Sequence, residues 1–145
     1  MIRSGTIVYP GVRIGENFET GHYALIRGEV VIGDDCRLGS YSSIEGKVTV
    51  GDGTVIRGRC EIPNSTIGKR CQIYAGVMFY DTPQPPDGPN LPPVIEDDVV
   101  IGCNAAVLGG VTVGARSFVA AHAFVTRDVP PDSYVKRSGE IVPRR

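Results

Sequence analysis

The sequence has almost no net charge and no long apolar run. Fifteen Lys and Arg residues against sixteen Asp and Glu residues give a formal net charge of −1. This balance argues against nucleic acid as a partner, because phosphate backbones bind clustered basic surfaces. No stretch reaches the roughly 18 consecutive apolar residues of a membrane-spanning helix. We therefore expect no nucleic acid and no membrane span, and a small molecule as the partner.

Histidine is scarce, and the cysteines are not paired in the sequence. Only two histidines are present, and the four cysteines form no C-x-x-C pair. Zinc sites draw several ligands from these two residue types, so no metal is expected. The first residues lack an apolar segment after a basic one, the pattern of a secretory signal. We expect a cytoplasmic protein with reduced thiols and no disulfide framework.

Glycine and proline are abundant, with nineteen and eleven residues, yet 41% of the chain is apolar. That apolar fraction is enough to offset the conformational entropy lost on folding. The 145 residues contain no stretch of linker composition. The sequence therefore predicts one folded domain.

Apolar residues recur every six positions along nearly the whole chain, which marks an internal repeat. A second row of small or β-branched residues follows four positions after the first, and Gly often stands directly after a first-row residue. Gly suits a sharp corner with unusual φ, so each period reads as strand, corner, strand. The spacing is one residue short between Ile62 and Ile67. The first row contains Ile2, Val8, Ile14, Thr20, Ile26, Ile32, Leu38, Ile44, Val50, Ile56, Ile62, Ile67, Ile73, Phe79, Ile95, Ile101, Val107, Val113, Val119 and Val125.

A six-residue period fits neither a helix of 3.6 residues per turn nor alternating hairpin strands, and leaves a solenoid. The pattern resembles the hexapeptide-repeat acyltransferase family from Ile2 to about Val129. The resemblance implies an all-β fold, a left-handed parallel β-helix of about seven triangular coils. Residues 18 apart then stack, with Ile14, Ile32 and Val50 on one face.

The same arrangement places the cysteines. Cys36, Cys60 and Cys71 occupy the small-residue position and should point into the prism as inert core thiols. Cys103 falls at a turn, where we expect it to be more exposed.

The repeat breaks once, between residues 80 and 94, where six of the eleven prolines lie. Proline lacks the N–H that a sheet ladder needs, so this segment should project as a semi-rigid arm. In the family that the chain resembles, such an arm reaches a neighbouring subunit and helps to close an active site. The resemblance thus implies a homotrimer with active sites between chains.

The segment VMFYDTPQP, residues 77–85, leads into the arm and resembles the V-x-F-x-N-D-x-x-P stretch of nucleotide-sugar N-acetyltransferases in this family. Asp81 stands where that stretch has the Asn beside the coenzyme A thiol, and Thr82 replaces the following Asp. An Asp can accept a proton outright, whereas an Asn only orients. Asp81 is the candidate catalytic base, and Tyr80 beside it is a candidate acceptor contact.

A second stretch, Thr20-Gly21-His22 followed by Ile26-Arg27, also recurs in the sugar N-acetyltransferase branch. The resemblance implies that His22 and Arg27 bind the acceptor. His22 lies three coils before Asp81, which is roughly 14 Å along the axis. The two therefore cannot share one proton transfer. We expect His22 and Arg27 either to hold a distant part of an extended acceptor or to belong to the cleft of a neighbouring chain.

The last coils resemble the family's coenzyme-binding edge, with Ala105, Ala120, Thr126 and Arg127 at matching positions. Residues 132–145 form a C-terminal tail in which KRSGEIVPRR replaces the family's G-N-P-A. Lys136 is a candidate contact for the coenzyme phosphates. A solvated basic tail is the alternative for this segment.

Together these features predict acyl transfer from acyl-CoA, with acetyl-CoA as the expected donor and no metal, to an amine. A nucleotide-linked amino sugar is the expected acceptor. A non-catalytic assembly or regulatory subunit and a sugar O-acetyltransferase remain alternatives, although the arm has no His for the common O-transfer mechanism. A zinc-dependent carbonic anhydrase of this fold would need three His ligands, and the chain has two.

Overall fold

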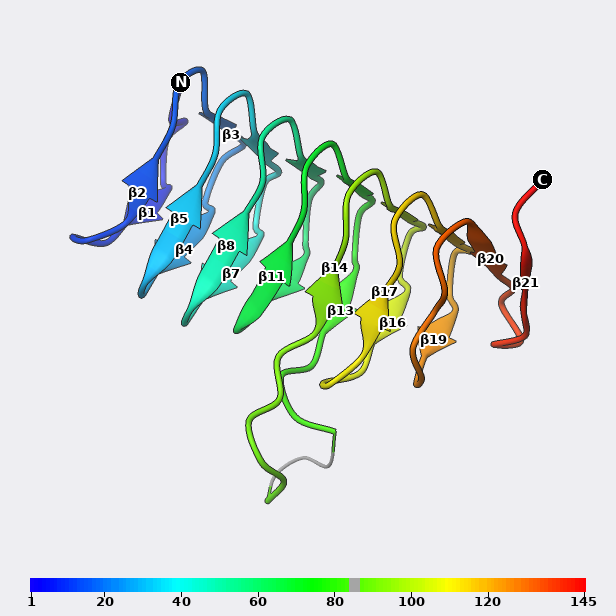
Figure 1. The fold of residues 1–145 in the computed structure, drawn as a ribbon. Helices are drawn as coiled ribbons and strands as arrows, with labels where there is room; N and C mark the ends of the chain where they lie inside the picture. The colour runs from blue at the N-terminus through cyan, green and yellow to red at the C-terminus, as the bar shows by residue number, and fades with distance from the viewer. Residues whose placement is uncertain (84–86) are drawn as a thin grey trace.

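Each turn of the chain adds one short strand to each of three parallel sheets, which we call faces A, B and C. In the computed structural model, which describes residues 1–83 and 87–145, the faces form a triangular prism with the chain termini at opposite ends (Figure 1). Face A has seven strands, which matches the seven coils expected from the repeat. The predicted left-handed parallel β-helix is confirmed, and none of the described residues lies in a helix that could span a membrane.

The strands are two or three residues long because a corner follows each of them. Face A comprises β1 (Ile7–Val8), β4 (Leu25–Arg27), β7 (Ser43–Glu45), β10 (Glu61–Ile62), β13 (Met78–Phe79), β16 (Ala106–Val107) and β19 (Phe124–Val125). Face B comprises β2 (Arg13–Ile14), β5 (Val30–Ile32), β8 (Val48–Val50), β11 (Ser65–Ile67), β14 (Val94–Ile95) and β17 (Thr112–Val113). Face C comprises β3 (Glu19–Thr20), β6 (Arg37–Leu38), β9 (Val55–Ile56), β12 (Gln72–Ile73), β15 (Val100–Ile101), β18 (Phe118–Val119), β20 (Ser133–Val135) and β21 (Ile141–Pro143).

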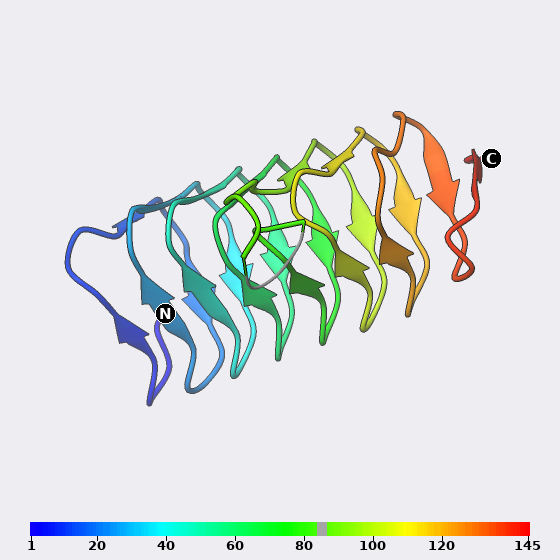
Figure 2. The same cartoon turned by 90° about the horizontal axis from the view of Figure 1, so that it is seen from below.

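The register between coils follows the expected spacing, and both irregularities of the repeat lie at one corner of the prism. Ile14 pairs with Ile32, and Ile32 with Val50, at the predicted spacing of 18 residues. The missing residue and the projecting arm both fall where the chain turns from face A to face B, which we call the A/B corner. The described parts of the arm project away from the prism at this corner in Figure 1, and they point toward the viewer in Figure 2, which is seen from below. Because the corner takes up both changes, the buried rows continue in register from end to end.

The glycines after the aliphatic positions serve a different purpose from the one expected. Positive φ falls on corner residues two places later, such as Asp35 and Tyr41, and not on Gly33 or Gly39. The glycines are needed because successive coils approach closely. A Cβ at Gly51, for example, would lie 2.6 Å from the carbonyl carbon of Gly68 on the next coil. The sequence marked the correct positions, and coil-to-coil contact is the reason for them.

The two ends of the prism differ from the repeat. Ile2, expected in the first buried row, is 50% exposed and precedes β1. Residues 132–145 are not a loose tail, since β20 joins face C and β21 pairs with it as an antiparallel strand. This hairpin covers the end of face C and leaves Lys136 exposed at its turn.

Three of the four thiols are buried, as the repeat predicts, and Cys103 is exposed. Burial raises the pKa of the Cys60 thiol to about 11 and also raises the pKa values of Cys36 and Cys71. The thiolate is the reactive form. We therefore expect iodoacetamide at neutral pH to modify Cys103 alone in the folded protein and all four thiols after unfolding, as counted by mass spectrometry. Equal labelling rates for Cys60 and Cys103 would contradict this core.

Candidate active site

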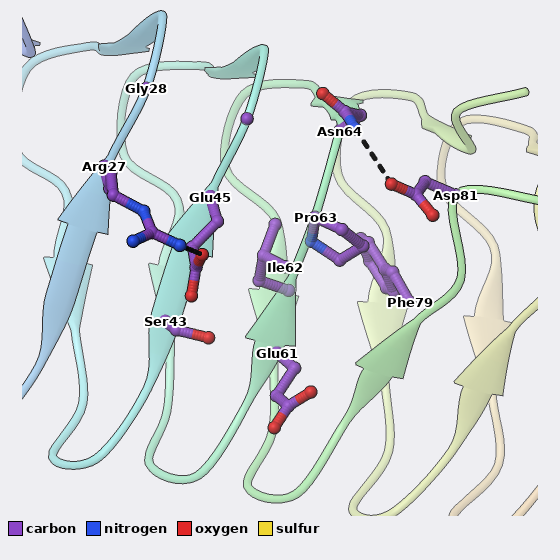
Figure 3. Close-up of a pocket in the computed structure, with 11 residues that line it drawn as sticks. Arg27, Gly28, Ser43, Glu45, Glu61, Ile62, Pro63, Asn64, Phe79 and Asp81 are labelled. Carbon is purple, nitrogen blue, oxygen red and sulfur yellow. Dashed lines mark hydrogen bonds and ion pairs between the residues drawn. The ribbon is translucent and has the colours of Figure 1, made fainter. Parts of the chain in front are cut away.

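A pocket of about 530 Å³ opens on face A beside the base of the projecting arm (Figure 3). Four successive coils contribute to it, from the end of β4 to the residues after β13. The lining residues are Arg27, Gly28, Ser43, Glu45, Gly46, Glu61, Ile62, Pro63, Asn64, Phe79 and Asp81. Of the residues expected from the sequence to act on substrate, Asp81 and Arg27 lie here.

The base of the arm is held in place by its own backbone. Leu91 N–H donates to the Asp81 carbonyl across 2.7 Å, and Gly110 N–H donates to the Leu91 carbonyl across 2.7 Å. Gly109 allows the close packing below, because a Cβ there would lie 2.6 Å from backbone atoms of Thr82. These contacts place Asp81 at a defined point of the A/B corner although the arm leaves the prism there.

The Asp81 carboxylate is oriented by Asn64, one coil earlier on the same corner. The Asn64 Nδ2–H donates to Asp81 Oδ2 across 2.8 Å, and Asn64 Oδ1 accepts from Lys47 N–H across 2.7 Å. Both ends of the amide are thus engaged, which fixes its orientation. Within residues 1–83 and 87–145, no hydrogen bond engages Asp81 Oδ1. A half-buried carboxylate with one oxygen held and one available has the geometry of a general base.

Arg27 lies at the opposite end of the pocket from Asp81 (Figure 3). Its guanidinium pairs with Glu45 on the next coil, and this hydrogen bond and charge raise the Arg27 pKa. The pocket also contains Glu61, so it holds three carboxylates against one guanidinium. With Arg27 neutralised by Glu45, the surroundings favour a cationic group such as an ammonium.

His22 lies apart from this pocket, as the spacing along the chain predicts. The His22 ring atom Nδ1 is 3.0 Å from Ser4 Oγ, and the His22 backbone N–H donates to Ser40 Oγ. Thr20, the polar member of the buried row, is only 1% exposed and accepts from Arg3 N–H across 3.0 Å. The Thr20 to His22 stretch therefore anchors the first residues of the chain, a structural role that the sequence did not reveal. Arg27 lines the Asp81 pocket and His22 does not, and acceptor binding by either residue stays a prediction.

The remaining predicted positions are spread over the C-terminal coils. The Tyr80 ring packs edge-on against Phe124 at 6.1 Å and lies outside the pocket. Ala105 is 1% exposed, so its side chain belongs to the core and only its backbone can meet a ligand.

The other three positions reach the surface at different corners. Ala120 is half-buried at the corner between faces C and A, and Thr126 and Arg127 are exposed at the A/B corner. The structure therefore does not gather the predicted coenzyme contacts into one patch of a single chain.

Asn64, Glu45 and Glu61 are the site residues that sequence reasoning missed. Glu45 and Glu61 occupy outward-facing positions on face A, where a charged residue is ordinary. Asn64 had a signal, because it lies in the corner shortened by one residue between Ile62 and Ile67. No group of three or more His, Cys, Asp or Glu side chains is placed to hold a metal in the described part of the chain.

The bacterial transferase hexapeptide family, whose pattern contains six repeats, matches residues 11–46, 29–64 and 92–127. These segments together span more than half of the 145 residues. The protein therefore belongs to this family, as the repeat in its sequence indicates.

A solved hexapeptide-repeat-containing acetyltransferase of Vibrio cholerae is 30% identical, and the superposition covers 90% of this chain and 72% of that chain with a TM-score of 0.66. The polySia-specific acetyltransferase NeuO shares the fold, with 19% identity, coverage of 97% and 77% and a TM-score of 0.54.

Among curated proteins, 2,3,4,5-tetrahydropyridine-2,6-dicarboxylate N-acetyltransferase of Staphylococcus aureus is 40% identical over 84 residues. The match covers 52% of this chain and 34% of the relative. The similarity thus spans about a third of the length of this relative.

Proposed function

We propose that the protein transfers an acetyl group from acetyl-CoA to an amine, with Asp81 as the general base. The observation that carries the proposal is the Asp81 carboxylate, held on one oxygen by Asn64 and facing a pocket rich in carboxylates. Two relatives are named acetyltransferases, and the Staphylococcus aureus relative is an N-acetyltransferase. N-transfer is therefore favoured over O-transfer.

The reaction requires little covalent chemistry from the protein itself. The amine nitrogen attacks the thioester carbonyl, the C–S bond breaks, and coenzyme A leaves as its thiol. Asp81 accepts the proton that the amine loses and returns it to the departing sulfur. Holding both reactants in line supplies much of the rate enhancement, and a backbone N–H stabilises the oxyanion. Glu45 and Glu61 favour an acceptor that arrives as an ammonium. This ammonium first releases one proton to solvent, and the neutral amine then attacks.

The acceptor that this proposal names is a nucleotide-linked amino sugar. Its amine would enter the Asp81 pocket, where Arg27 is a further acceptor contact. Tyr80 would contact the acceptor outside the pocket, and His22 would contact a more distant part. Ala105, Ala120, Thr126, Arg127 and Lys136 remain the proposed coenzyme contacts. Because they lie at different corners, the coenzyme would run between two chains.

A homotrimer follows from the same proposal. The projecting arm at the A/B corner and the exposed Phe124 on face A, beside Tyr80, offer surface for a neighbouring chain. Light scattering should give a mass three times the 15.5 kDa of one chain. A monomer that is fully active would contradict the shared site.

Acetyl-CoA binding provides the test that separates an enzyme from a non-catalytic assembly subunit. At about 100 times its Kd, acetyl-CoA should stabilise the folded state by about 2.7 kcal/mol, measured as a rise in unfolding temperature. Desulfo-coenzyme A, which lacks the thioester, is the matched ligand for checking that binding does not need the reacting group. No shift with either ligand at millimolar concentration would leave the assembly subunit as the better account.

A further inference from the structure

A second groove, of about 420 Å³, lies on the N-terminal half of face C, apart from Asp81. The N-terminal segment, β3, β6, β9 and the corners after these strands form its walls. Its charged side chains are Arg3, Arg37, Arg57 and Glu19. Three guanidinium groups against one carboxylate leave an excess of two positive charges, in a chain whose formal net charge is −1. The groove is therefore a local concentration of positive charge.

Most N–H donors of these guanidinium groups form no hydrogen bond to the described residues, 1–83 and 87–145. Arg37 Nε lies 3.4 Å from Glu19 Oε2, which is its ion pair. Arg3 donates one hydrogen bond, from Nη1 to the Thr20 carbonyl across 2.7 Å. Arg57 donates one, from Nη2 to Gln72 Oε1 across 3.3 Å. Since a guanidinium has five N–H donors, each of the three keeps several for a ligand.

Other arginines on the prism show how this fold neutralises a guanidinium. At the corner between faces B and C, Arg70 forms two hydrogen bonds with Asp98 one coil later, at 2.8 and 3.0 Å. Arg116 does the same with Asp132. In the part of the chain that the structure describes, no such carboxylate partner meets Arg3 or Arg57. Arg70 and Arg116 are thus each neutralised by a carboxylate, whereas Arg3 and Arg57 keep their positive charge in the groove.

The groove is also shaped for close approach. Three of its lining positions are Gly21, Gly39 and Gly58, so no side chain covers the backbone there. The Arg57 guanidinium lies 5.0 Å from the centre of the Tyr74 ring, which restrains its orientation. A small ligand with several acceptor oxygens can therefore meet fixed donors without displacing side chains.

We propose that this groove binds a phosphate-bearing small molecule through Arg3, Arg37 and Arg57. A guanidinium fork matches two phosphate oxygens at once, and the excess of two positive charges suits a diphosphate or a phosphate monoester. The anion site itself does not depend on acetyl transfer. Its assignment to the diphosphate of a nucleotide-linked acceptor rests on the proposed function.

The test is calorimetric titration of the intact protein with inorganic pyrophosphate at moderate ionic strength. Arg57→Gln and Arg37→Gln should each weaken binding by about tenfold or more, because each removes a charge-assisted contact. Arg13→Gln is the matched control, since Arg13 is an exposed arginine of β2 on face B. It removes the same charge and should leave binding unchanged. Equal losses in Arg13→Gln and Arg57→Gln, or no saturable binding, would overturn the site.

Competition then identifies the source of the phosphate. Uridine diphosphate should displace pyrophosphate if the groove serves the acceptor, and adenosine 3′,5′-diphosphate should do so if it serves the coenzyme. Either result supports a phosphate site, whereas tighter binding of the dicarboxylate pimelate than of pyrophosphate would contradict it. Asp81→Asn should keep pyrophosphate affinity even if it loses turnover, so failure of the anion site and failure of the proposed base are separable.

Discussion

Replacing Asp81 with Asn is expected to lower the turnover of acetyl transfer by roughly 10²- to 10⁴-fold, the usual contribution of a positioned general base. The variant keeps the shape of the side chain, and its amide oxygen can still accept from Asn64, which donates to Asp81 across 2.8 Å. The fold and the binding of acetyl-CoA should survive. Only the group that takes the amine proton is removed.

Asp35→Asn is the matched control, because Asp35 is an exposed carboxylate at the corner between faces B and C, away from the arm and outside the pocket. Its turnover should equal that of the unaltered protein. The reaction should be followed by loss of thioester absorbance, since a thiol reagent would also react with the exposed Cys103. An unchanged rate in Asp81→Asn would remove Asp81 from the mechanism.

Asn64→Asp extends the same test to the residue that orients the base. The substitution keeps the acceptor for Lys47 N–H but replaces the donor to Asp81 with a second carboxylate. We expect kcat to fall by at least about tenfold through misplacement of the base, with KM for acetyl-CoA unchanged. A rise in KM with unchanged kcat would show that Asn64 serves binding and not positioning.

Ile44→Ala is expected to cost about 2 to 5 kcal/mol of the free energy of unfolding, the range for a large side chain removed from a packed core. Ile44 is 1% exposed and pairs with Ile26 and Ile62 in the middle of face A. Ile44 packs in a core formed by side chains of all three faces, and such surroundings relax only partially into a cavity.

Ile2→Ala makes the same chemical change at the same position of the repeat. Because Ile2 is 50% exposed at the open end, we expect a cost within about 0.5 kcal/mol. Urea denaturation followed by circular dichroism measures both variants. Equal costs would mean that the terminal coil is packed as tightly as the central ones, contrary to the structure.

The fold could be predicted because one local rule is repeated many times. Ile26, Ile44 and Ile62 each stand in the same local pattern, and stacking at a constant spacing turns that pattern into a buried row. The corner glycines show the limit of such reasoning. Gly51 was expected at its position, but the contact with Gly68 on the next coil that requires it becomes visible only once the coils are stacked.

The site was predictable only in part. Asp81 was identified because it interrupts a recognisable stretch at the one large break in the repeat. Asn64 was not, since its role depends on a contact across 17 residues of sequence that a shortened corner makes possible. Thr20 is visible in the sequence as the polar member of an apolar row, but its hydrogen bond from Arg3 depends on how the residues before β1 fold back.

The most direct test of the central claim is a crystal structure of the full chain with acetyl-CoA. The account predicts that the thioester carbonyl lies close to Asp81 Oδ1, with the position of the acceptor amine between them. The coenzyme should lie between two chains and run along the C-terminal coils. A thioester bound on another face, far from Asp81 of every chain, would contradict it.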